Sequence, residues 1–127
     1  MRILLDTHIF LWAITDDSRL TNVHRLKYTD EESELYLSVA SLWETLIKVG
    51  LGRLTLPVQA ADYLAKQMEK NRVAVLPIRM THLAELAKLP PLHRDPFDRM
   101  LVAQARAEGM SILSADPGIR GYGVAIL

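Results

Sequence analysis

The segment that decides the fold is Arg2-Ile3-Leu4-Leu5-Asp6, near the start of the chain. Its apolar run of Ile and Leu predicts a short buried strand, since such continuous runs are typical of strands that are covered on both faces. The acid Asp6 follows at the point where the strand should end. A second run, Ser111-Ile112-Leu113-Ser114-Ala115, is followed by Asp116 in the same way. The carboxyl ends of parallel strands face one crevice of an open α/β sheet, so both acids are expected there.

Strand patterns alternate with helical patterns along the rest of the chain. The expected strands are 2–5, 35–37, 73–78, 111–115 and 124–127, and the expected helices are 9–14, 21–33, 38–49, 60–70, 81–88 and 95–109. The alternation predicts the α/β class, with a parallel sheet covered by helices. The length of 127 residues, half of them hydrophobic, fits a single domain over residues 1–127 with a substantial core.

Two further acids, Glu44 and Asp98, open helical patterns in the middle of the chain. Several carboxylates that meet in one crevice repel each other unless a cation lies between them. The four histidines are scattered without the spacing of metal ligands, and there is no cysteine. Carboxylates alone suit Mg²⁺ or Mn²⁺ better than zinc. We therefore expect a site for a hard divalent metal at Asp6, Glu44, Asp98 and Asp116.

Each acid also has a structural interpretation. Glu44 lies three residues after Ser41, the spacing of a capping box, in which the acid accepts from the cap amide. Asp95 before Pro96 is typical of a helix N-cap, and Asp98 would then lie in the positive first turn. Asp116 before a Pro-Gly pair is typical of a turn. Asp6 could cap a helix that starts at Thr7-His8. Only a shared pocket explains all four acids at once.

The composition limits the classes of function. Fifteen basic and fifteen acidic residues give no net charge, whereas nucleic-acid-binding proteins are usually basic. Outside the four acids, however, 15 basic residues stand against 11 acidic ones, which allows a weak attraction to phosphates. The absence of cysteine excludes disulfides and thiol nucleophiles. No apolar run is long enough for a membrane span, and charge interrupts the first residues too early for a signal peptide, which favours a cytoplasmic protein.

With these residues placed, the whole chain resembles a PIN-domain ribonuclease, and in particular the VapC-type toxins of toxin–antitoxin pairs. The resemblance is carried by four stretches in order: Leu4-Leu5-Asp6-Thr7-His8, Ser38-Val39-Ala40-Ser41-Leu42-Trp43-Glu44, His93-Arg94-Asp95-Pro96-Phe97-Asp98-Arg99-Met100-Leu101-Val102-Ala103-Gln104-Ala105, and Ser114-Ala115-Asp116-Pro117. The metal-site acids of that family map onto Asp6, Glu44, Asp98 and Asp116. Its small polar residue before the last acid maps onto Ser114.

The resemblance implies a PIN-like three-layer α/β/α fold with a five-stranded parallel sheet, Mg²⁺ as cofactor with Mn²⁺ able to substitute, and cleavage of RNA. We expect Asp6 and Asp98 to be direct metal ligands, and Glu44 and Asp116 to act through water or on a second ion. The hydroxyls of Thr7 and Ser114 suit the support of carboxylates. The remaining candidates are Arg94 and Arg99 for contacts with phosphate, and Asp95 and His8 for a minor part in the site.

The resemblance also implies an antitoxin whose C-terminal segment crosses the active-site groove, and a homodimer. An apolar docking surface could come from Trp12, Leu42, Trp43 and Leu46, although core positions in two helices are the favoured interpretation for most of them. Two other functions remain open. One is a different magnesium-dependent phosphoryl-transfer enzyme with Asp6 as nucleophile, although His8 stands where such enzymes usually have a second Asp. The other is a non-catalytic binding module whose acids only cap helices.

Overall fold

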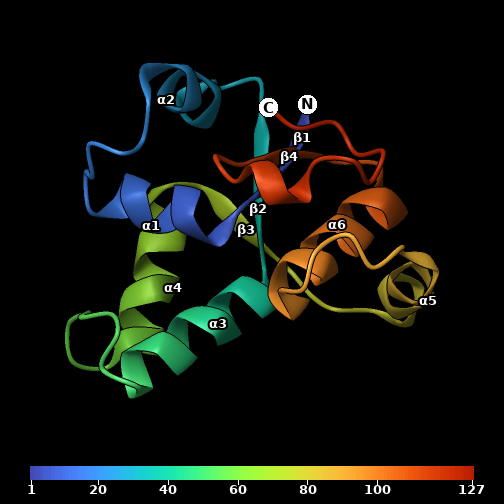
Figure 1. Ribbon diagram of the computed structural model, residues 1–127. Coiled ribbons are helices and arrows are strands. Elements are labelled where there is room, and N and C mark those ends of the chain that lie inside the picture. Colours follow the sequence, from blue (N-terminus) through green and yellow to red (C-terminus); the bar gives the residue numbers. More distant parts are fainter.

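The computed structural model describes residues 1–127, and it is built around a parallel sheet (Figure 1). The four strands are β1 (Arg2–Leu5), β2 (Glu34–Ser38), β3 (Val73–Leu76) and β4 (Ser111–Leu113). Their order is β3-β2-β1-β4, and each neighbouring pair is parallel. The α/β class and the parallel sheet predicted from the sequence are confirmed.

Six α-helices connect and cover the strands. They are α1 (Thr7–Ile14), α2 (Asn22–Thr29), α3 (Val39–Gly50), α4 (Ala60–Lys70), α5 (Met80–Lys88) and α6 (Pro96–Glu108), followed by a short 3-10 helix, η1 (Pro117–Ile119). None of them is both long enough and apolar enough to cross a bilayer.

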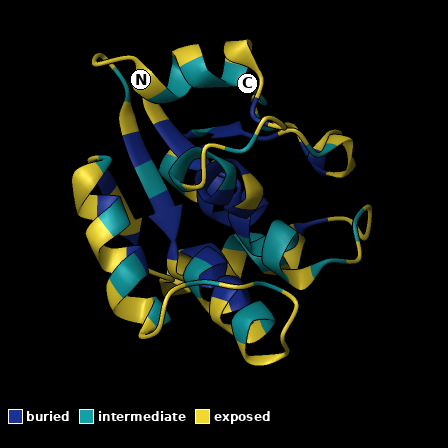
Figure 2. Cartoon of the chain, turned by 90° about the vertical axis from the view of Figure 1, so that its left-hand side faces the viewer, coloured by how far each residue is buried: buried dark blue, intermediate teal, exposed yellow.

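The sheet is buried on both faces, as Figure 2 shows for the strands at the centre of the molecule. Successive side chains of a strand point to opposite faces. In β1, Ile3 and Leu5 accordingly belong to one core cluster, which includes residues of α1 and α4, whereas Leu4 belongs to a second cluster formed largely by α6. The expected three layers of helix, sheet and helix follow from this alternation.

The fifth strand expected at 124–127 is wrong as an independent strand. The chain there forms only an isolated parallel bridge between Ile112 of β4 and Ile126. Gly121 and Gly123, both at positive φ, turn the chain just before this point, so it reaches β4 only with its last residues. Two hydrogen bonds hold it there: the Ile112 N–H donates to the Ala125 carbonyl, and the Leu127 N–H donates to the Ile112 carbonyl.

Three further expectations need correction. The helix expected at 21–33 ends at Thr29, and the one expected at 81–88 starts one residue earlier, at Met80, with Arg79 at its N-cap. Core positions for the apolar residues of α3 are also wrong in part: Trp43 is 60% exposed and Leu46 is 39% exposed. Helix α3 therefore presents apolar side chains to solvent, while Trp43 also packs edge-on against the ring of Phe97 in α6.

Candidate metal centre

Two of the acids meet at the carboxyl ends of neighbouring strands. Leu5 of β1 pairs with Leu113 of β4, and Asp6 and Ser114 are the residues that directly follow these two strands. The Ser114 hydroxyl donates to Asp6 Oδ2 at 2.6 Å, and the Asp116 N–H donates to the Ser114 oxygen at 2.9 Å. One serine thus fixes both the Asp6 carboxylate and the backbone that carries Asp116. The Asp6 side chain is almost fully buried, and its second oxygen, Oδ1, is not used by Ser114 and is free for another partner.

The third acid, Glu44, lies inside α3. This helix starts directly after β2, because Ser38 caps it by accepting from the Ala40 N–H. Glu44 is therefore in the second turn and cannot reach the cap. Its side chain is only 10% exposed, and its Oε2 lies 3.6 Å from Lys48 Nζ one turn later. A nearly buried acid with a single long ion pair is a costly arrangement, unless another cation shares it.

The fourth acid, Asp98, lies in the first turn of α6. Asp95 is the N-cap, accepting from the N–H groups of Phe97 and Asp98, and Pro96 is the first helical residue, as predicted. Burial is the largest cause that raises the pKa of Asp98 to about 8, and the negative charges of Asp6, Asp95, Asp116 and Glu44 contribute to this rise in that order. Because these charges act on one carboxyl, the four acids that are remote in sequence are close in space.

The helix-capping interpretation therefore explains only part of the cluster. Asp6 occupies the N-cap position of α1, but its side chain makes no capping hydrogen bond. Glu44 is no cap, so the proposed capping box with Ser41 is wrong. Asp116 does behave as a turn acid, since its Oδ1 accepts from the Gly118 N–H at 2.8 Å, yet its Oδ2 points toward the other side chains of the site.

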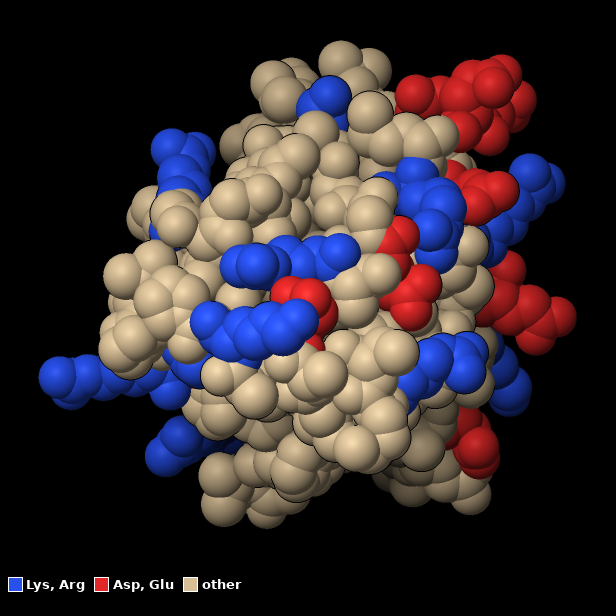
Figure 3. All heavy atoms as spheres, turned by 90° about the vertical axis from the view of Figure 1, so that its right-hand side faces the viewer, with Lys and Arg blue, Asp and Glu red and all other residues tan.

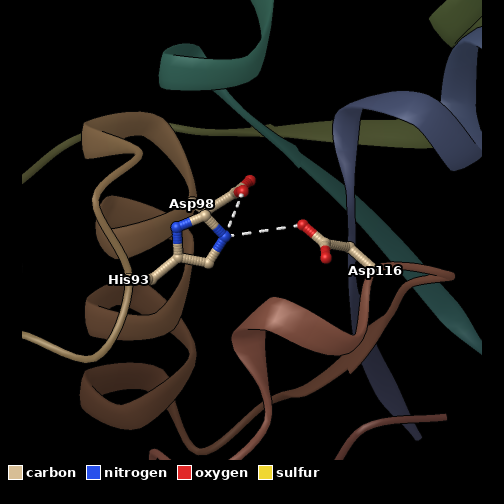
Figure 4. A group of neighbouring side chains, drawn as sticks. All are labelled: His93, Asp98 and Asp116. Carbon is tan, nitrogen blue, oxygen red and sulfur yellow. Dashed lines mark ion pairs between the residues drawn. The ribbon is translucent and has the colours of Figure 1, made fainter.

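His93 is the residue that sequence reasoning left outside the site. Figure 4 shows its ring between Asp98 and Asp116, reached from the loop before α6. Its Nε2 lies 3.2 Å from Asp98 Oδ2 and 3.5 Å from Asp116 Oδ2. The signal available in the sequence was its place two residues before the cap Asp95. The spacing of the histidines alone could not reveal it, because its partners are carboxylates and no second histidine is involved.

The hydrogen bonds of His93 define its chemical role. The Asp95 N–H donates to its Nδ1 at 3.0 Å, so the hydrogen of the neutral ring is on Nε2. A nitrogen that carries hydrogen cannot ligate a metal, so in this arrangement His93 donates toward the carboxylates. Gly118 makes room for the ring, because a Cβ there would lie 2.8 Å from Nε2. The acids are therefore the better candidates for metal ligands.

The other candidate residues have different surroundings. The Thr7 hydroxyl donates to Ser41 Oγ at 2.8 Å, so Thr7 ties α1 to α3 and the expected contact with a carboxylate is not made. Arg99 is engaged within the protein: its Nη1 donates to the Pro90 carbonyl at 2.9 Å and lies 3.4 Å from the hydroxyl of Tyr122. That hydroxyl accepts from the His93 N–H at 2.7 Å. Arg94 is exposed and makes no ion pair.

A shallow cavity of about 220 Å³ opens beside the acids, lined by Asp6, His8, Trp12, Arg19, Ala115 and Asp116. His8 and Trp12 come from α1, and their ring centres lie 5.8 Å apart. Arg19, which was not singled out in the sequence, places its guanidinium 5.1 Å above the Trp12 ring. Figure 3 shows basic and acidic side chains intermixed on the α5–α6 side of the molecule, in keeping with the zero net charge.

The family model of the PIN domain matches residues 3–124 of the chain. The chain belongs to the PIN domain family. The match covers all four acids, so the resemblance noted in the sequence is confirmed at the level of the family. No curated protein matches the chain in sequence.

Solved structures share the fold of this PIN domain at low identity. VapBC2 from Rickettsia felis bound to a DNA fragment from its promoter has a TM-score of 0.70 at 15% identity, covering 100% of this chain and 98% of that one. VapBC-1 from nontypeable Haemophilus influenzae has a TM-score of 0.71 at 16% identity, covering 100% and 97%. FitAcB from Neisseria gonorrhoeae has a TM-score of 0.66 at 20% identity, covering 98% and 96%.

The raised pKa of Asp98 predicts how the metal-free PIN domain responds to pH. Because the folded pKa of about 8 lies above the value near 3.9 of an unfolded Asp, this group stabilises the fold fully below pH 4, and the contribution is lost as pH rises to 8. In the presence of a chelator, Asp98→Asn should therefore stabilise the protein at pH 8 by on the order of 3 kcal/mol and hardly at pH 4. Thermal melts across this range test it. Equal differences at both pH values would contradict the pKa shift.

The Ser114 hydroxyl predicts a second effect. Ser114→Ala removes the donor that orients Asp6, so the affinity for Mn²⁺ should fall about 10- to 100-fold, as for other residues that hold a ligand. Calorimetric titration with Mn²⁺ measures this. Ser111→Ala, at the start of the strand that Ser114 follows, is the matched control and should leave the affinity unchanged. Equal affinities for Ser114→Ala and the parent chain would show that the hydroxyl does not support a ligand.

Proposed function

We propose that this PIN domain is a metal-dependent endoribonuclease and the toxin of a toxin–antitoxin pair. The observation that carries the proposal is the convergence of Asp6, Glu44 and Asp116 on Asp98, where burial and the neighbouring negative charges together raise the pKa of Asp98 to about 8. Two of these acids have no capping role to explain them. Such crowding of carboxylates is unfavourable without a cation and suits Mg²⁺, with Mn²⁺ able to substitute.

The surroundings of each acid suggest its part in holding the ion. Asp6 and Asp98 are mostly buried and are the best candidates for direct ligands. Glu44 already has Lys48 nearby, and Asp116 is 39% exposed, so both suit contacts through water or a second ion. Ser114 keeps the Asp6 carboxylate in one orientation. This division agrees with the preference of Mg²⁺ for few carboxylates and several waters.

Hydrolysis of a phosphodiester adds water across a P–O bond: the hydroxyl goes to phosphorus and the hydrogen to the leaving oxygen. The ion, when bound, supplies Lewis acidity that makes water a better nucleophile and offsets charge on the phosphate. The carboxylates orient the attacking water and accept its proton. The Nε2–H of His93, between Asp98 and Asp116, is a donor available to a phosphate oxygen.

An antitoxin is the second part of the proposal. The solved structures that share this fold include VapBC assemblies, and the resemblance to VapC-type toxins implies a partner protein. Helix α3 exposes Trp43, Leu46 and Ile47, and an apolar cavity of about 360 Å³ lies between α3, α4 and β3. Such a surface suits a protein segment. A homodimer is the form that the resemblance implies.

The competing functions receive less support. A binding module whose acids only cap helices is disfavoured, because neither Asp6 nor Glu44 caps. A phosphatase with Asp6 as nucleophile needs a second acid two residues on, where the chain has His8. Trapping of a phosphorylated Asp6 would nevertheless favour this alternative over the nuclease.

The nuclease proposal predicts the effect of removing single charges. Asp6→Asn and Asp98→Asn should each lower the cleavage of total RNA in Mg²⁺ or Mn²⁺ more than about 100-fold, because loss of a ligand costs more than loss of a residue that supports one. Gel analysis with mapping of the cut ends measures this. Asp62→Asn, an exposed acid in the first turn of α4, is the matched control and should cleave like the parent chain.

The folding of both variants must be checked alongside their activity. Asp98→Asn is expected to stabilise the metal-free protein, so a loss of activity in this variant would not be explained by unfolding. Full cleavage by both variants, or cleavage by the parent chain in excess chelator, would refute the proposal.

A further inference from the structure

A groove leads away from the acids on the α1 side of the molecule. The cavity beside Asp6 and Asp116 adjoins a second one of about 290 Å³, and the two share His8, Trp12 and Arg19. The second cavity continues between α1 and the end of α3, where Lys48 lines it, and the segment after α3, where Arg53 lines it. The two cavities together form one channel, called here the basic groove, defined by His8, Trp12, Arg19, Lys48 and Arg53.

The charges of the basic groove are opposite to those of the metal centre. In the second cavity, which lies away from the acids of the metal centre, three cationic side chains stand against a single acid, Asp17. Arg19 is held by Asp17, with its Nη2 2.7 Å from Oδ2, and its side chain remains 68% exposed. Lys48 lies 3.6 Å from Glu44 of the metal centre, whereas Arg53 is exposed and has no ion-pair partner, so the charge of Arg53 is the one most available to a ligand. An RNA backbone that runs from the acids into this groove would find positive charge to compensate its phosphates.

The groove also offers aromatic surface. The Arg19 guanidinium lies 5.1 Å from the centre of the Trp12 ring, and the centre of the His8 ring lies 5.8 Å from it. Aromatic rings and arginine planes stack with unpaired bases, and this contact is worth about 1–3 kcal/mol per base. In a duplex the bases are already stacked on each other and could not reach Trp12. The combination therefore favours a single strand over a helix.

The basic groove is unlike the apolar cavity between α3, α4 and β3. Eight of the nine residues that line that cavity are hydrophobic, which suits a protein segment, whereas only four of the ten residues that line the second cavity of the groove are hydrophobic and three are cationic. The two surfaces thus differ in the chemistry of the ligand they fit, although α3 contributes to both.

We infer that the basic groove binds the single-stranded RNA that flanks the cleaved phosphodiester, with phosphates at Arg53 and Lys48 and a base on Trp12 and Arg19. The inference rests on the proposed function and extends it by naming the path of the substrate. Arg53 and Arg19 are substrate-binding residues, while the acids carry the chemistry.

Salt dependence of binding gives the sharpest test. The probe is a fluorescein-labelled single-stranded RNA of mixed sequence, bound to the whole chain with Ca²⁺ in place of Mg²⁺. Arg53→Ala should weaken binding about 5- to 20-fold and lower the slope of log K against log salt by about 0.7, the value for one lost phosphate contact with a single strand. Arg53→Lys should restore the slope, because the charge is kept. Lys70→Ala, an exposed cation at the end of α4, is the matched control and should change neither quantity.

Fluorescence reports on the aromatic contact separately. In Trp43→Phe, Trp12 is the single tryptophan of the chain, and the same RNA without label should quench it to saturation. In Trp43→Phe with Arg53→Ala, quenching should need the same 5- to 20-fold higher RNA concentration. A polyglutamate of equal charge should compete only weakly, because it cannot stack.

The possible failures are distinguishable. In one outcome RNA binds, but Arg53→Ala leaves Kd and the salt slope unchanged and the fluorescence of Trp12 is not quenched. This result would overturn the inference about the groove, and the nuclease proposal would still be decided by the Asp6 and Asp98 variants. If polyglutamate competes as well as RNA, the groove is an acidic-peptide site and the inference is overturned. If the parent chain binds no RNA, both the groove and the nuclease proposal are overturned.

Discussion

The mutual repulsion of four carboxylates is the constraint on which the rest of this structure depends. Burial of Asp98, together with the charges of the nearby Asp6, Asp116 and Glu44, raises its pKa to about 8. No fold keeps such a cluster at the end of its central strands for stability, because each added charge makes the others less favourable. The sheet, the helix starts and the supporting hydrogen bonds make sense as a frame that holds these acids ready for a cation.

The frame uses a few local devices. Pairing of β1 with β4 sets Asp6 beside Ser114, and one hydroxyl then joins Asp6 to the backbone of Asp116. The cap Asp95 fixes the first turn of α6 and so the position of Asp98. Tyr122 holds the loop that carries His93, and Gly118 leaves space for the ring. Each device acts on backbone near an acid, which is why rigid elements rather than mobile loops carry the site.

Much of this fold and site was predictable from the sequence, and the predictions that were wrong have physical reasons. Buried parallel strands have continuous apolar runs, so β1 and the acid after it could be predicted. The helix start at Asp95-Pro96 could be predicted as well. The fifth strand was not, because its residues are apolar but Gly121 and Gly123 turn the chain until only one pair with β4 remains. The exposure of Trp43 was missed because helical periodicity shows an apolar face and not what covers it. His93 was missed because its partners are set by tertiary contacts.

The convergence of the acids on one ion can be tested directly by diffraction. Crystals of the protein soaked with Mn²⁺ and measured at the manganese absorption edge would locate the ion without reference to activity. We predict an anomalous peak in contact with the carboxylates of Asp6 and Asp98, with the ring of His93 outside its coordination shell. A crystal that shows no peak among the four acids at saturating Mn²⁺, or peaks only at other surface carboxylates, would contradict the metal centre.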